Sequence, residues 1–391
     1  MRIIHIEDRF HPDMGYQINF LSRYHSSEDE FIIITSTSLS IWNVENDEAL
    51  LQRDREFEKK YKVSIIRLPA FFARGDKSFV WIRQLTNKLL SLNPDVVYVH
   101  CIESFSSARV FLRRKIGNKC QIVTDTHSLY NQFRTSLKFK IYMLLLKKFV
   151  VKNINRNSYS VFYTAEENRQ ILSEVYEIRR DLIFPGLIGT DLDLFKYDEK
   201  EAEKKLKELS ISQGKTTILY TGKINNIKKP HLLLEAIKLI ENKISEELTI
   251  LFVGSVDQEY YDQHCKIRFK NSLIQTIFHP MVPNNKLYIY YSLASFAVFP
   301  RHNTLSSLDA QACRLPIIME SDQTNDVRLK MGGLTFRPGE TNDLADKILM
   351  LIEDPDLREK LSMGGYEFIK ENYDYRKIIL NMEKIIHKVN T

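Results

Sequence analysis

Cysteine is scarce in this chain, and its spacing argues against both of its usual structural roles. The 391 residues contain only Cys101, Cys120, Cys265 and Cys313. No Cys-x-x-Cys pair and no His-x-x-x-His spacing occurs, so neither a disulfide framework nor a zinc site is indicated. We expect four reduced thiols, most of them in the core.

Long apolar runs are also missing. No stretch reaches the length that spans a bilayer, and the chain opens directly on the strand-like run Ile3–Ile6 without a signal peptide. We therefore expect a cytoplasmic protein. The net charge of +6 suits anionic ligands, a membrane surface or nucleic acid equally well, so charge alone does not choose among them.

Acidic residues are absent from 134–156, a stretch rich in lysine, arginine, leucine and phenylalanine. This pattern predicts a basic amphipathic helix. Such a helix can lie on anionic lipid at the inner face of a membrane, or it can be a packed surface helix with a solvated basic face. Both interpretations remain open at this point.

What the chain does contain is an alternation of short apolar runs with helix-like stretches. This alternation predicts α/β architecture with doubly wound parallel sheets, and the length favours two domains. The expected strands of the first half lie at 3–6, 31–34, 63–66, 96–99, 122–123 and 161–163, and those of the second half at 217–220, 248–253, 297–299 and 317–318.

Polar residues follow several of the expected strands of the first half. Gly15, His100 with Glu103, and His127 fall just past strand ends, where ligands bind in such sheets. For either histidine taken alone, a structural role in the loop is the better interpretation.

The stretch 297–318 is the most informative in the chain. It predicts a strand, a polar turn, a helix capped by Asn303 or Thr304, and a second strand after Pro316. The helix start at Leu305, Ser306 and Ser307 would offer unpaired N–H groups to a phosphate or diphosphate, and Asp309 could accept hydrogen bonds from paired hydroxyls. An ordinary βαβ unit whose helix start faces water is the alternative.

The residues from Asp309 to Ile318 resemble the Glu-Ala-Met-Ala-Cys-Gly-x-Pro-Val-Ile signature of the family 4 glycosyltransferases, which have the GT-B fold. In that family two glutamates eight residues apart serve the donor sugar and the nucleotide ribose. Asp309 falls on the second glutamate, whereas Arg301 replaces the first. Arg314 stands where the family usually has glycine.

Three further segments carry the resemblance. Pro12-Asp13-Met14-Gly15 is similar to the family's glycine-containing loop, and His127 matches its histidine near the reacting sugar. Residues 222–228 resemble a Gly-Arg-Leu-x-x-x-Lys segment whose two cations neutralise the diphosphate, with Lys223 at the Arg position and Lys228 at the Lys position. Lysine keeps the charge there but loses the bidentate geometry of arginine.

The resemblance implies two Rossmann-like domains that face a central cleft. Residues 1–186 would form the acceptor domain and 187–372 the nucleotide-sugar donor domain, while a terminal helix at 373–391 would cross back to the first. Asp191-Leu192-Asp193 imitates an Asp-x-Asp metal motif, but its register with Phe195 fits the family's interdomain linker better.

The implied function is transfer of a sugar from a nucleotide-diphosphate sugar, with UDP expected, to a hydroxyl of a glycan or lipid-linked glycan. Retention of configuration, no catalytic metal, no cofactor and no nucleic-acid partner are expected, in bacterial surface polysaccharide synthesis. His127 would be catalytic, Gly15 would lie on the donor side, and His100 and Glu103 would face the acceptor. A UDP-sugar 2-epimerase and a non-catalytic partner subunit of another transferase remain alternatives.

Overall fold

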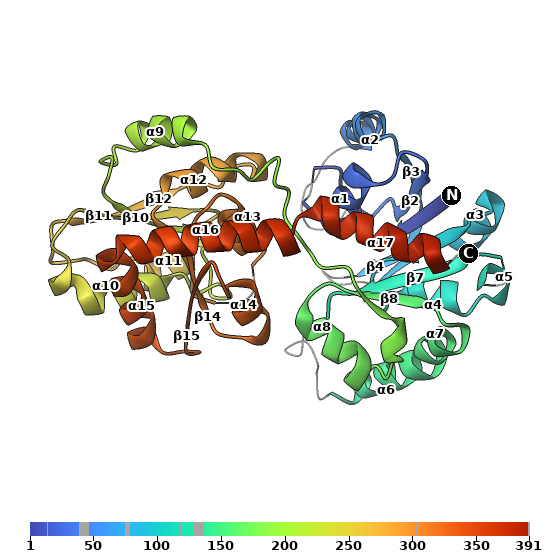
Figure 1. Cartoon of the computed structure of the whole chain (residues 1–391). Coiled ribbons are helices and arrows are strands. Elements are labelled where there is room, and N and C mark those ends of the chain that lie inside the picture. The colour runs from blue at the N-terminus through green and yellow to red at the C-terminus, as the bar shows by residue number, and fades with distance from the viewer. Residues whose placement is uncertain are drawn as a thin grey trace. The chain divides into compact units, whose positions relative to one another are not determined.

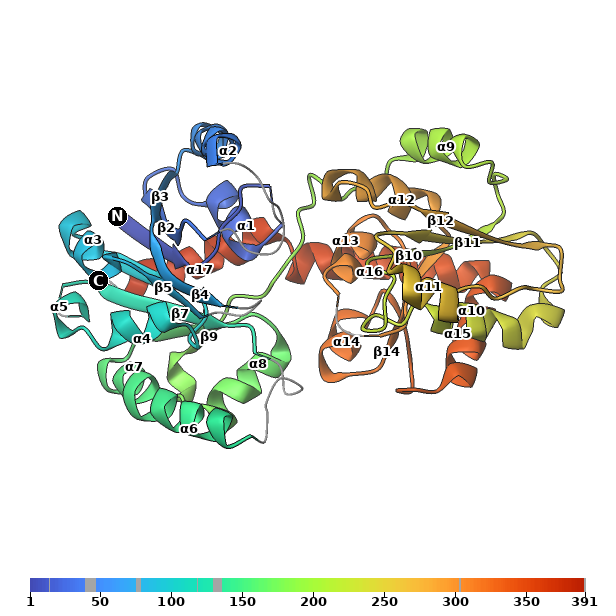
Figure 2. The same ribbon diagram turned by 180° about the vertical axis from the view of Figure 1, so that it is seen from behind.

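The computed structural model describes residues 1–13, 15–38, 47–74, 79–117, 119–128, 136–301 and 304–389. The chain forms two compact units, each a twisted sheet flanked by helices (Figures 1 and 2). The first unit is Met1–Ile188 together with Arg376–Thr391, and the second is Gly189–Tyr375.

The sheet of the first unit has seven strands in the order β3-β2-β1-β6-β7-β8-β9, and every pairing is parallel. All six strands expected in the first half of the chain are present. The strands are β1 Arg2–Glu7, β2 Glu30–Ser36, β3 Ser64–Leu68, β6 Val96–Val99, β7 Gln121–Thr126, β8 Ser160–Tyr163 and β9 Ile183–Pro185.

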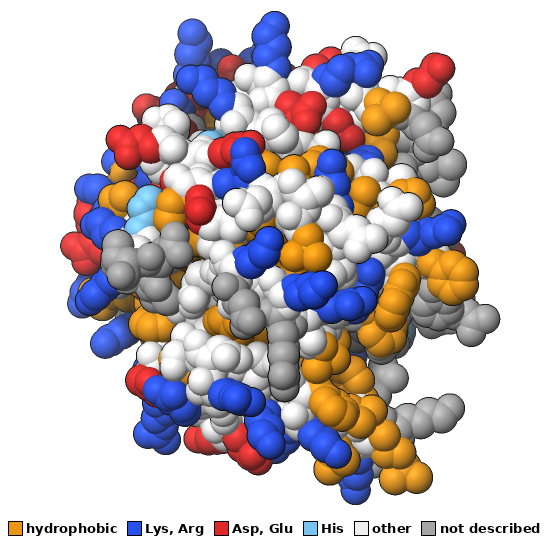
Figure 3. All heavy atoms as spheres, turned by 90° about the vertical axis from the view of Figure 1, so that its right-hand side faces the viewer, with side chains coloured by type: hydrophobic (Ala, Val, Ile, Leu, Met, Phe, Trp, Pro, Cys, Tyr) orange, Lys and Arg blue, Asp and Glu red, His pale blue; other side chains and the backbone are white. Residues whose placement is uncertain are grey.

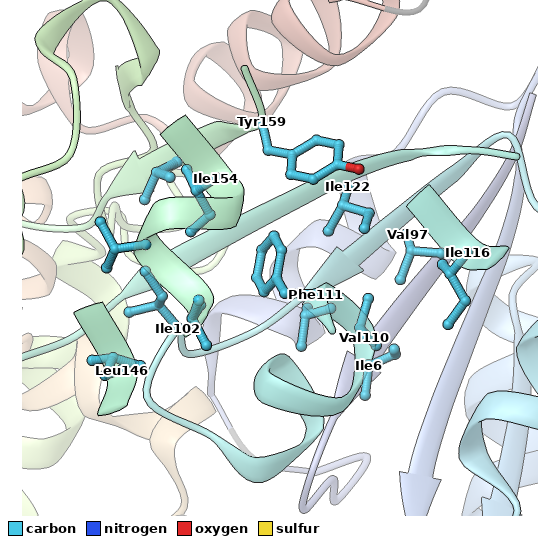
Figure 4. Packing of buried hydrophobic residues seen from close by; sticks show 14 of the residues in the cluster. Ile6, Val97, Ile102, Val110, Phe111, Ile116, Ile122, Leu146, Ile154 and Tyr159 are labelled. Carbon is cyan, nitrogen blue, oxygen red and sulfur yellow. The ribbon is translucent and has the colours of Figure 1, made fainter. Parts of the chain in front are cut away.

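The central strands of this sheet are buried on both faces, which is why they read as nearly continuous apolar runs rather than as alternating ones. Val96–Val99 is fully buried, and Ile4 and Ile6 on the neighbouring strand have no exposed surface. One apolar cluster fills the space between the sheet and its helices (Figure 4). It includes Ile6, Val97, Ile102, Val110, Phe111, Ile116, Ile122, Leu146, Ile154 and Tyr159.

Short helices and single helical turns connect these strands. They are α1 Gln17–Tyr24, α2 Asp47–Tyr61, α3 Leu85–Leu92, α4 Phe105–Phe111, α5 Arg114–Gly117, α6 Leu137–Leu146, η2 Lys147–Val151, α7 Lys152–Asn157, α8 Glu166–Gln170, η3 Ile171–Val175 and η4 Arg180–Leu182. The helix expected at 134–156 corresponds to α6, the π-helical turn η2 and α7; residues 134 and 135 lie outside the described residues.

Two features complete the first unit. An antiparallel hairpin of β4 Ala70–Arg74 and β5 Phe79–Ile82 was not anticipated from the sequence. The terminal helix α17, Tyr375–Val389, packs on the first unit, as the fold class required. Its Glu383 accepts a hydrogen bond from the N–H of Ser26 at 2.7 Å, and His387 lies 2.8 Å from Asp29.

The sheet of the second unit has six parallel strands in the order β12-β11-β10-β13-β14-β15. It contains the four strands expected in the second half, together with β12 and β15. The six strands are β10 Thr216–Thr221, β11 Leu248–Val253, β12 Ile274–His279, β13 Phe296–Phe299, β14 Ile317–Glu320 and β15 Gly333–Phe336.

Helices cover both faces of this second sheet (Figures 1 and 2). They are α9 Glu199–Glu208, α10 His231–Ile240, η5 Glu241–Lys243, α11 Gln258–His264, η6 Asn284–Lys286, α12 Leu287–Leu293, α13 Ser306–Ala312, α14 Gln323–Arg328, α15 Thr341–Glu353 and α16 Pro355–Asn372. Among the described helices of the whole chain, none combines the length and the apolar character needed to cross a membrane.

The strand order reverses once in each sheet. In the first unit the reversal lies between β1 and β6, and in the second it lies between β10 and β13. Ligands of open α/β sheets bind beyond the carboxyl ends of the strands at such points. We call these two places the β1/β6 edge and the β10/β13 edge.

Candidate active site

The β10/β13 edge brings together the predicted residues of the second unit. The loop after β10 carries Lys223 and Lys228, and the segment after β13 leads into α13, which carries Asp309. These residues are far apart in the sequence. Their meeting at one sheet edge follows from the strand order alone.

Two glycines fix the start of the loop after β10. Gly222 has a φ of +141°, a region that side chains rarely adopt, and its N–H donates to the carbonyl of Val253 at 3.0 Å. A Cβ on Gly254 would lie only 1.8 Å from the carbonyl oxygen of Gly222. The ends of β10 and β11 therefore touch backbone to backbone, which gives the lysine loop a fixed base.

The two lysines of this loop lie close to each other. The side-chain oxygen of Asn225 accepts the N–H of Lys228 at 3.0 Å and so closes the turn between them. Burial lowers the pKa of Lys228, and the charge of Lys223 lowers it further. Lys223 is exposed and Lys228 half-buried, and neither pairs with an acid among the described residues. Two neighbouring cations without a described acid partner would suit a multiply charged anion.

Asp309 sits one turn into α13 in a partly buried position. Its Oδ1 accepts a hydrogen bond from the Thr190 hydroxyl at 2.7 Å. Burial raises the pKa of Asp309 to about 7, and the bond from Thr190 opposes that shift. The buried phenols Tyr291 and Tyr375 lie within reach of its charge, which adds to the effect of burial in raising their pKa values. Without a ligand, the carboxyl group is therefore poised between its neutral and ionised forms near neutral pH.

The start of α13 differs from the sequence-based expectation. The N–H groups of Ser306 and Ser307 are not unpaired, because they donate to the side chain and the carbonyl of Thr304, each at 3.3 Å. Leu305 is the residue before the helix and Thr304 supplies the side-chain contact, while Asn303 lies outside the described residues. These long bonds close the first turn, so an anion would have to displace them.

Arg301 is paired within its own unit. Its guanidinium donates to Glu320 Oε1 at 3.2 Å, and the same oxygen accepts the N–H of Gly339 at 3.0 Å. The cation at the position of the family's first glutamate therefore faces a carboxylate at the end of β14.

The β1/β6 edge of the first unit is built around a buried ion pair. Asp125 accepts from His100 at 2.8 Å and from the N–H of Cys101 at 2.7 Å. Burial alone would raise the pKa of Asp125, but the charge and hydrogen bond of His100 lower it to about 2. Burial would also lower the pKa of His100, yet Asp125 raises it above its ordinary value. Asp125 thus favours the charged form of His100.

The other ring nitrogen of His100 is engaged as well. It lies 3.1 Å from His5 Nδ1, and burial together with the charge of His100 lowers the pKa of His5 well below its ordinary value. The expectation that His100 faces an acceptor is therefore corrected, since both of its nitrogens are already used inside the unit.

Glu103 is likewise occupied. Its Oε1 accepts hydroxyl hydrogen bonds from Thr126, Ser128 and Tyr176 at 2.6–2.7 Å. Its other oxygen accepts from the thiol of Cys101 at 3.0 Å. A carboxylate so fully engaged organises the loops around it, which argues against the acceptor-side role expected for Glu103.

His127, another predicted residue of the first unit, remains open to solvent. Its side chain is 41% exposed, its Nε2 lies 3.7 Å from Asp125 and its Nδ1 lies 3.4 Å from the Thr164 hydroxyl. Asp125 therefore faces two histidines, one buried and one exposed. Gly15 is exposed too, in the loop after β1.

Comparisons with known proteins bear on the second unit first. Residues 201–368 match the family model described as "Glycosyl transferases group 1". Those residues form a glycosyltransferase group 1 domain.

A D-inositol 3-phosphate glycosyltransferase of Nocardia farcinica is 26% identical over 210 residues, which cover 51% of this chain and 46% of that protein. The capsular polysaccharide biosynthesis glycosyltransferase CapM of Staphylococcus aureus is 25% identical over 205 residues, which cover 50% and 52%. The chain spans about half the length of the curated relatives it matches.

Solved structures extend the similarity to the whole chain at the level of fold. The structure of Anabaena Alr3699/HepE in complex with UDP has a TM-score of 0.73 at 12% identity, over 99% of this chain and all of that one. A glycosyltransferase from Rickettsia africae gives the same TM-score at 16% identity, over 99% and 98%. These similarities, with the two parallel sheets, confirm the expected GT-B fold.

Lys223, Lys228 and Asp309 all lie inside the matched glycosyltransferase group 1 domain. Residues at both edges were not predicted from the sequence. Thr190 and Tyr375 approach Asp309 from segments outside the matched range, which no local pattern reveals. Glu7 ends β1, and burial raises its pKa to about 7 against the opposing charge of His100. Its position directly after an apolar run was the available signal.

Proposed function

We propose that this protein transfers a sugar from a nucleotide-diphosphate sugar to a hydroxyl group of a glycan or lipid-linked glycan. The observation that carries the proposal is the pair of neighbouring lysines at the β10/β13 edge, the same edge that holds Asp309, within the matched glycosyltransferase group 1 domain. UDP is the first nucleotide to test, because Alr3699/HepE shares the fold and was solved with UDP.

Lys223 and Lys228 would bind the diphosphate. The bond between the anomeric carbon and the phosphate oxygen breaks during transfer, and negative charge grows on the departing nucleoside diphosphate. Two ammonium groups at a fixed place stabilise that charge more in the transition state than in the ground state, which is the requirement for catalysis. The partly buried position of Lys228 strengthens its interaction with an anion.

Asp309 would accept the ribose hydroxyls. Its ionised carboxylate has lone pairs for two hydroxyl donors, and Thr190 occupies only one of its oxygens. The first turn of α13 would contribute N–H groups from Ser306 and Ser307 once Thr304 releases them. Leu305 would line the same turn.

The reaction we propose retains the anomeric configuration, as the resemblance to family 4 implies. The acceptor oxygen forms its bond to the anomeric carbon on the face from which the phosphate leaves, and the acceptor proton passes to a departing phosphate oxygen. This course needs no covalent nucleophile from the protein. His127 and Gly15 would serve the sugar, with Asp125 holding His127 in place.

The setting we propose is the synthesis of a bacterial surface polysaccharide. The similarity to the staphylococcal capsular polysaccharide glycosyltransferase supports this setting. The acceptor would then be a growing glycan or its lipid-linked precursor.

Calorimetric titration of UDP, GDP and ADP into the full chain tests the donor site directly. We expect one nucleotide to bind clearly more tightly than the others, and its sugar conjugates to bind at the same site. Release of free nucleoside diphosphate should then depend on added acceptor. Tight binding without any turnover across glycan acceptors would favour the non-catalytic partner subunit, and epimerised sugar without acceptor would favour the epimerase. Absence of binding by all three nucleotides would refute the proposal.

A further inference from the structure

The outer side of α6 and η2 carries an unusual row of exposed apolar side chains. The members follow helical spacing along one side, and each exposes more than two fifths of its surface. They are Leu137 at 72%, Ile141 at 50%, Leu144 at 66%, Leu145 at 46% and Phe149 at 43%. We call these five residues the apolar stripe. Contiguous apolar surface of this kind marks an interaction site in a soluble protein.

The fold does not need the apolar stripe. The opposite side of the same helical segment already supplies its core contacts through Leu146, Val150 and Ile154, all of which are buried. Tyr142 anchors the helix further, because its hydroxyl donates to the carbonyl of Glu103 at 2.6 Å. A helix that is apolar on both sides requires an apolar environment on both.

The charges beside the apolar stripe are all of one sign. Lys140, Lys148 and Lys152 are exposed, and no acid occurs anywhere in 134–156. Within the described part of the chain, none of these three lysines forms an ion pair, whereas Lys147 is paired with Glu177 at 2.6 Å. Figure 3 shows apolar side chains gathered among Lys and Arg at its lower right. In Figure 1, α6 lies at the bottom of the first unit.

The unanticipated hairpin adds exposed aromatic rings to the first unit. Phe71 on β4 is 78% exposed and Trp81 on β5 is 43% exposed. The guanidinium of Arg109 lies 4.5 Å from the Trp81 ring, and Phe105 at the start of α4 packs against it edge-on. Tryptophan with flanking arginine is the composition of membrane–water interfaces.

We propose that the apolar stripe docks on an anionic lipid surface, with the hairpin aromatics as a second point of contact. Leucine and phenylalanine insert below the headgroups, while the lysines reach the phosphates from flexible stems. Lipid suits this face better than a protein partner does, because the segment offers apolar groups and cations but no acidic side chain that could pair with a basic group of a protein. The proposal is independent of any catalytic activity.

Co-sedimentation of the full chain with vesicles provides the test. One set of vesicles contains phosphatidylcholine alone, and the other an equal mixture of phosphatidylcholine and phosphatidylglycerol. We expect binding to the anionic vesicles only, with loss of binding as salt rises. The triple variant Lys140→Gln, Lys148→Gln, Lys152→Gln should bind about 100-fold more weakly, at about fivefold per lysine. Leu137→Ser with Leu144→Ser should lose at least about tenfold.

Matched controls come from the second unit. Lys200→Gln, Lys204→Gln and Lys207→Gln remove three exposed charges from α9, and Leu239→Ser with Met281→Ser removes two exposed apolar side chains. Both controls should bind vesicles as the original chain does. A Trp42→Phe chain leaves Trp81 as its one tryptophan, whose emission should shift to the blue on anionic vesicles.

Three results would overturn the proposal. The first is equal binding to neutral and anionic vesicles. The second is unchanged binding by both the triple lysine variant and the double leucine variant. The third is a loss of binding in these two variants that is no larger than in the controls. An unshifted Trp81 emission, with binding otherwise as expected, would remove the hairpin and leave the stripe as the docking element.

Discussion

The two strand-reversal edges use the same topology but treat their polar residues in opposite ways. At the β1/β6 edge, His100 and Asp125 are hydrogen-bonded to each other, and Glu103 accepts hydrogen bonds from neighbouring hydroxyls inside the unit. At the β10/β13 edge, Lys223 and Lys228 form no ion pair with any described acid, and Asp309 accepts a hydrogen bond from the Thr190 hydroxyl. The first edge is a finished internal network, while the second has charges that a ligand would complete.

This difference separates structural from functional polar groups more sharply than position in the fold does. Both edges lie where ligands bind in α/β sheets. Satisfied buried groups stabilise the unit and are costly to disturb, whereas unpaired charges cost stability and are kept for binding. Substitutions of His100, Asp125 or Glu103 should therefore act mainly on folding, and those at the second edge mainly on affinity.

The largest effect should come from Asp125→Asn. The amide removes the negative charge and leaves the buried His100 without the carboxylate that favours its charged form, so we expect a loss of about 3–5 kcal/mol in the free energy of unfolding. Urea unfolding followed by tryptophan fluorescence measures this loss in the first unit alone, because residues 42 and 81 both fall within its range.

The pH dependence of this effect has a definite sign. The folded pKa of Asp125, about 2, lies below its ordinary value. The stabilisation is therefore complete above about pH 4 and is lost as the pH falls toward 2. Asp346→Asn, on the exposed side of α15, is the matched control and should change stability by less than about 0.5 kcal/mol. An Asp125→Asn chain as stable as the original would show that the first edge is not an internal network.

The next effect concerns the lysine pair. Lys223→Ala or Lys228→Ala should each weaken binding of the nucleoside diphosphate by about 1.5–3 kcal/mol, because each removes a charged donor to the diphosphate. The free energy of unfolding should stay the same or rise slightly, because each variant removes one of two neighbouring like charges. Calorimetric titration measures the affinity, with Lys204→Ala on α9 as a control of equal charge change. Intact affinity in both variants would move the anion site elsewhere.

The sequence predicted the fold in detail because its signals were local. Each expected strand was a short apolar run, and the helix after β13 followed from residue spacing. Lys223 and Lys228 were predicted from a motif that spans only the seven residues 222–228. The sheet order then placed the two lysines and Asp309 at one edge without further information.

The sequence could not predict which side chains surround Asp309, His100 and Glu103. Thr190, Tyr291 and Tyr375 approach Asp309 from distant segments, and the bonds of Thr304 to the first turn of α13 depend on loop geometry. His100 and Glu103 had the right composition and position for an acceptor site. Only the surrounding hydroxyls and Asp125 show that their hydrogen bonds are already used.

The pKa of Asp309 gives a smaller effect that changes with pH. Its folded value of about 7 lies above the ordinary value of an aspartate. Stability should therefore fall as the pH rises from about 4 toward 7, where the folded carboxyl group ionises. Ribose hydroxyls require the ionised form, so UDP affinity should rise over the last part of that range.

Asp309→Asn separates these effects from ionisation of UDP itself. The amide still accepts from Thr190 but should bind UDP more weakly by about 1–3 kcal/mol at pH 8. The gap between the two proteins should close as the pH falls below 7, while the variant becomes relatively more stable as the pH rises. Affinity that matches the original chain at pH 8 would make Asp309 a structural acid, and the comparison of the two edges would then depend on the lysines alone.

The smallest effect is expected at Arg314, which ends α13 with a φ of +62°. A residue with a side chain is strained there by roughly 1–2 kcal/mol, which glycine would relieve. However, the guanidinium lies 5.2 Å from the Tyr366 ring, a contact that contributes about 0.5–1 kcal/mol at a surface site. Arg314→Gly should therefore raise stability by only about 0.5 kcal/mol, and Arg314→Ala should lower it, because alanine keeps the strain and loses the ring contact.

Lys62→Gly is the counterpart in the first unit, after α2 at a φ of +56°, and no aromatic contact of Lys62 is described. Melting curves should rank Lys62→Gly above Arg314→Gly and Arg314→Ala last. If Arg314→Gly instead melts lower and also binds UDP more weakly, the arginine serves the nucleotide site, and the β10/β13 edge gains a third cation.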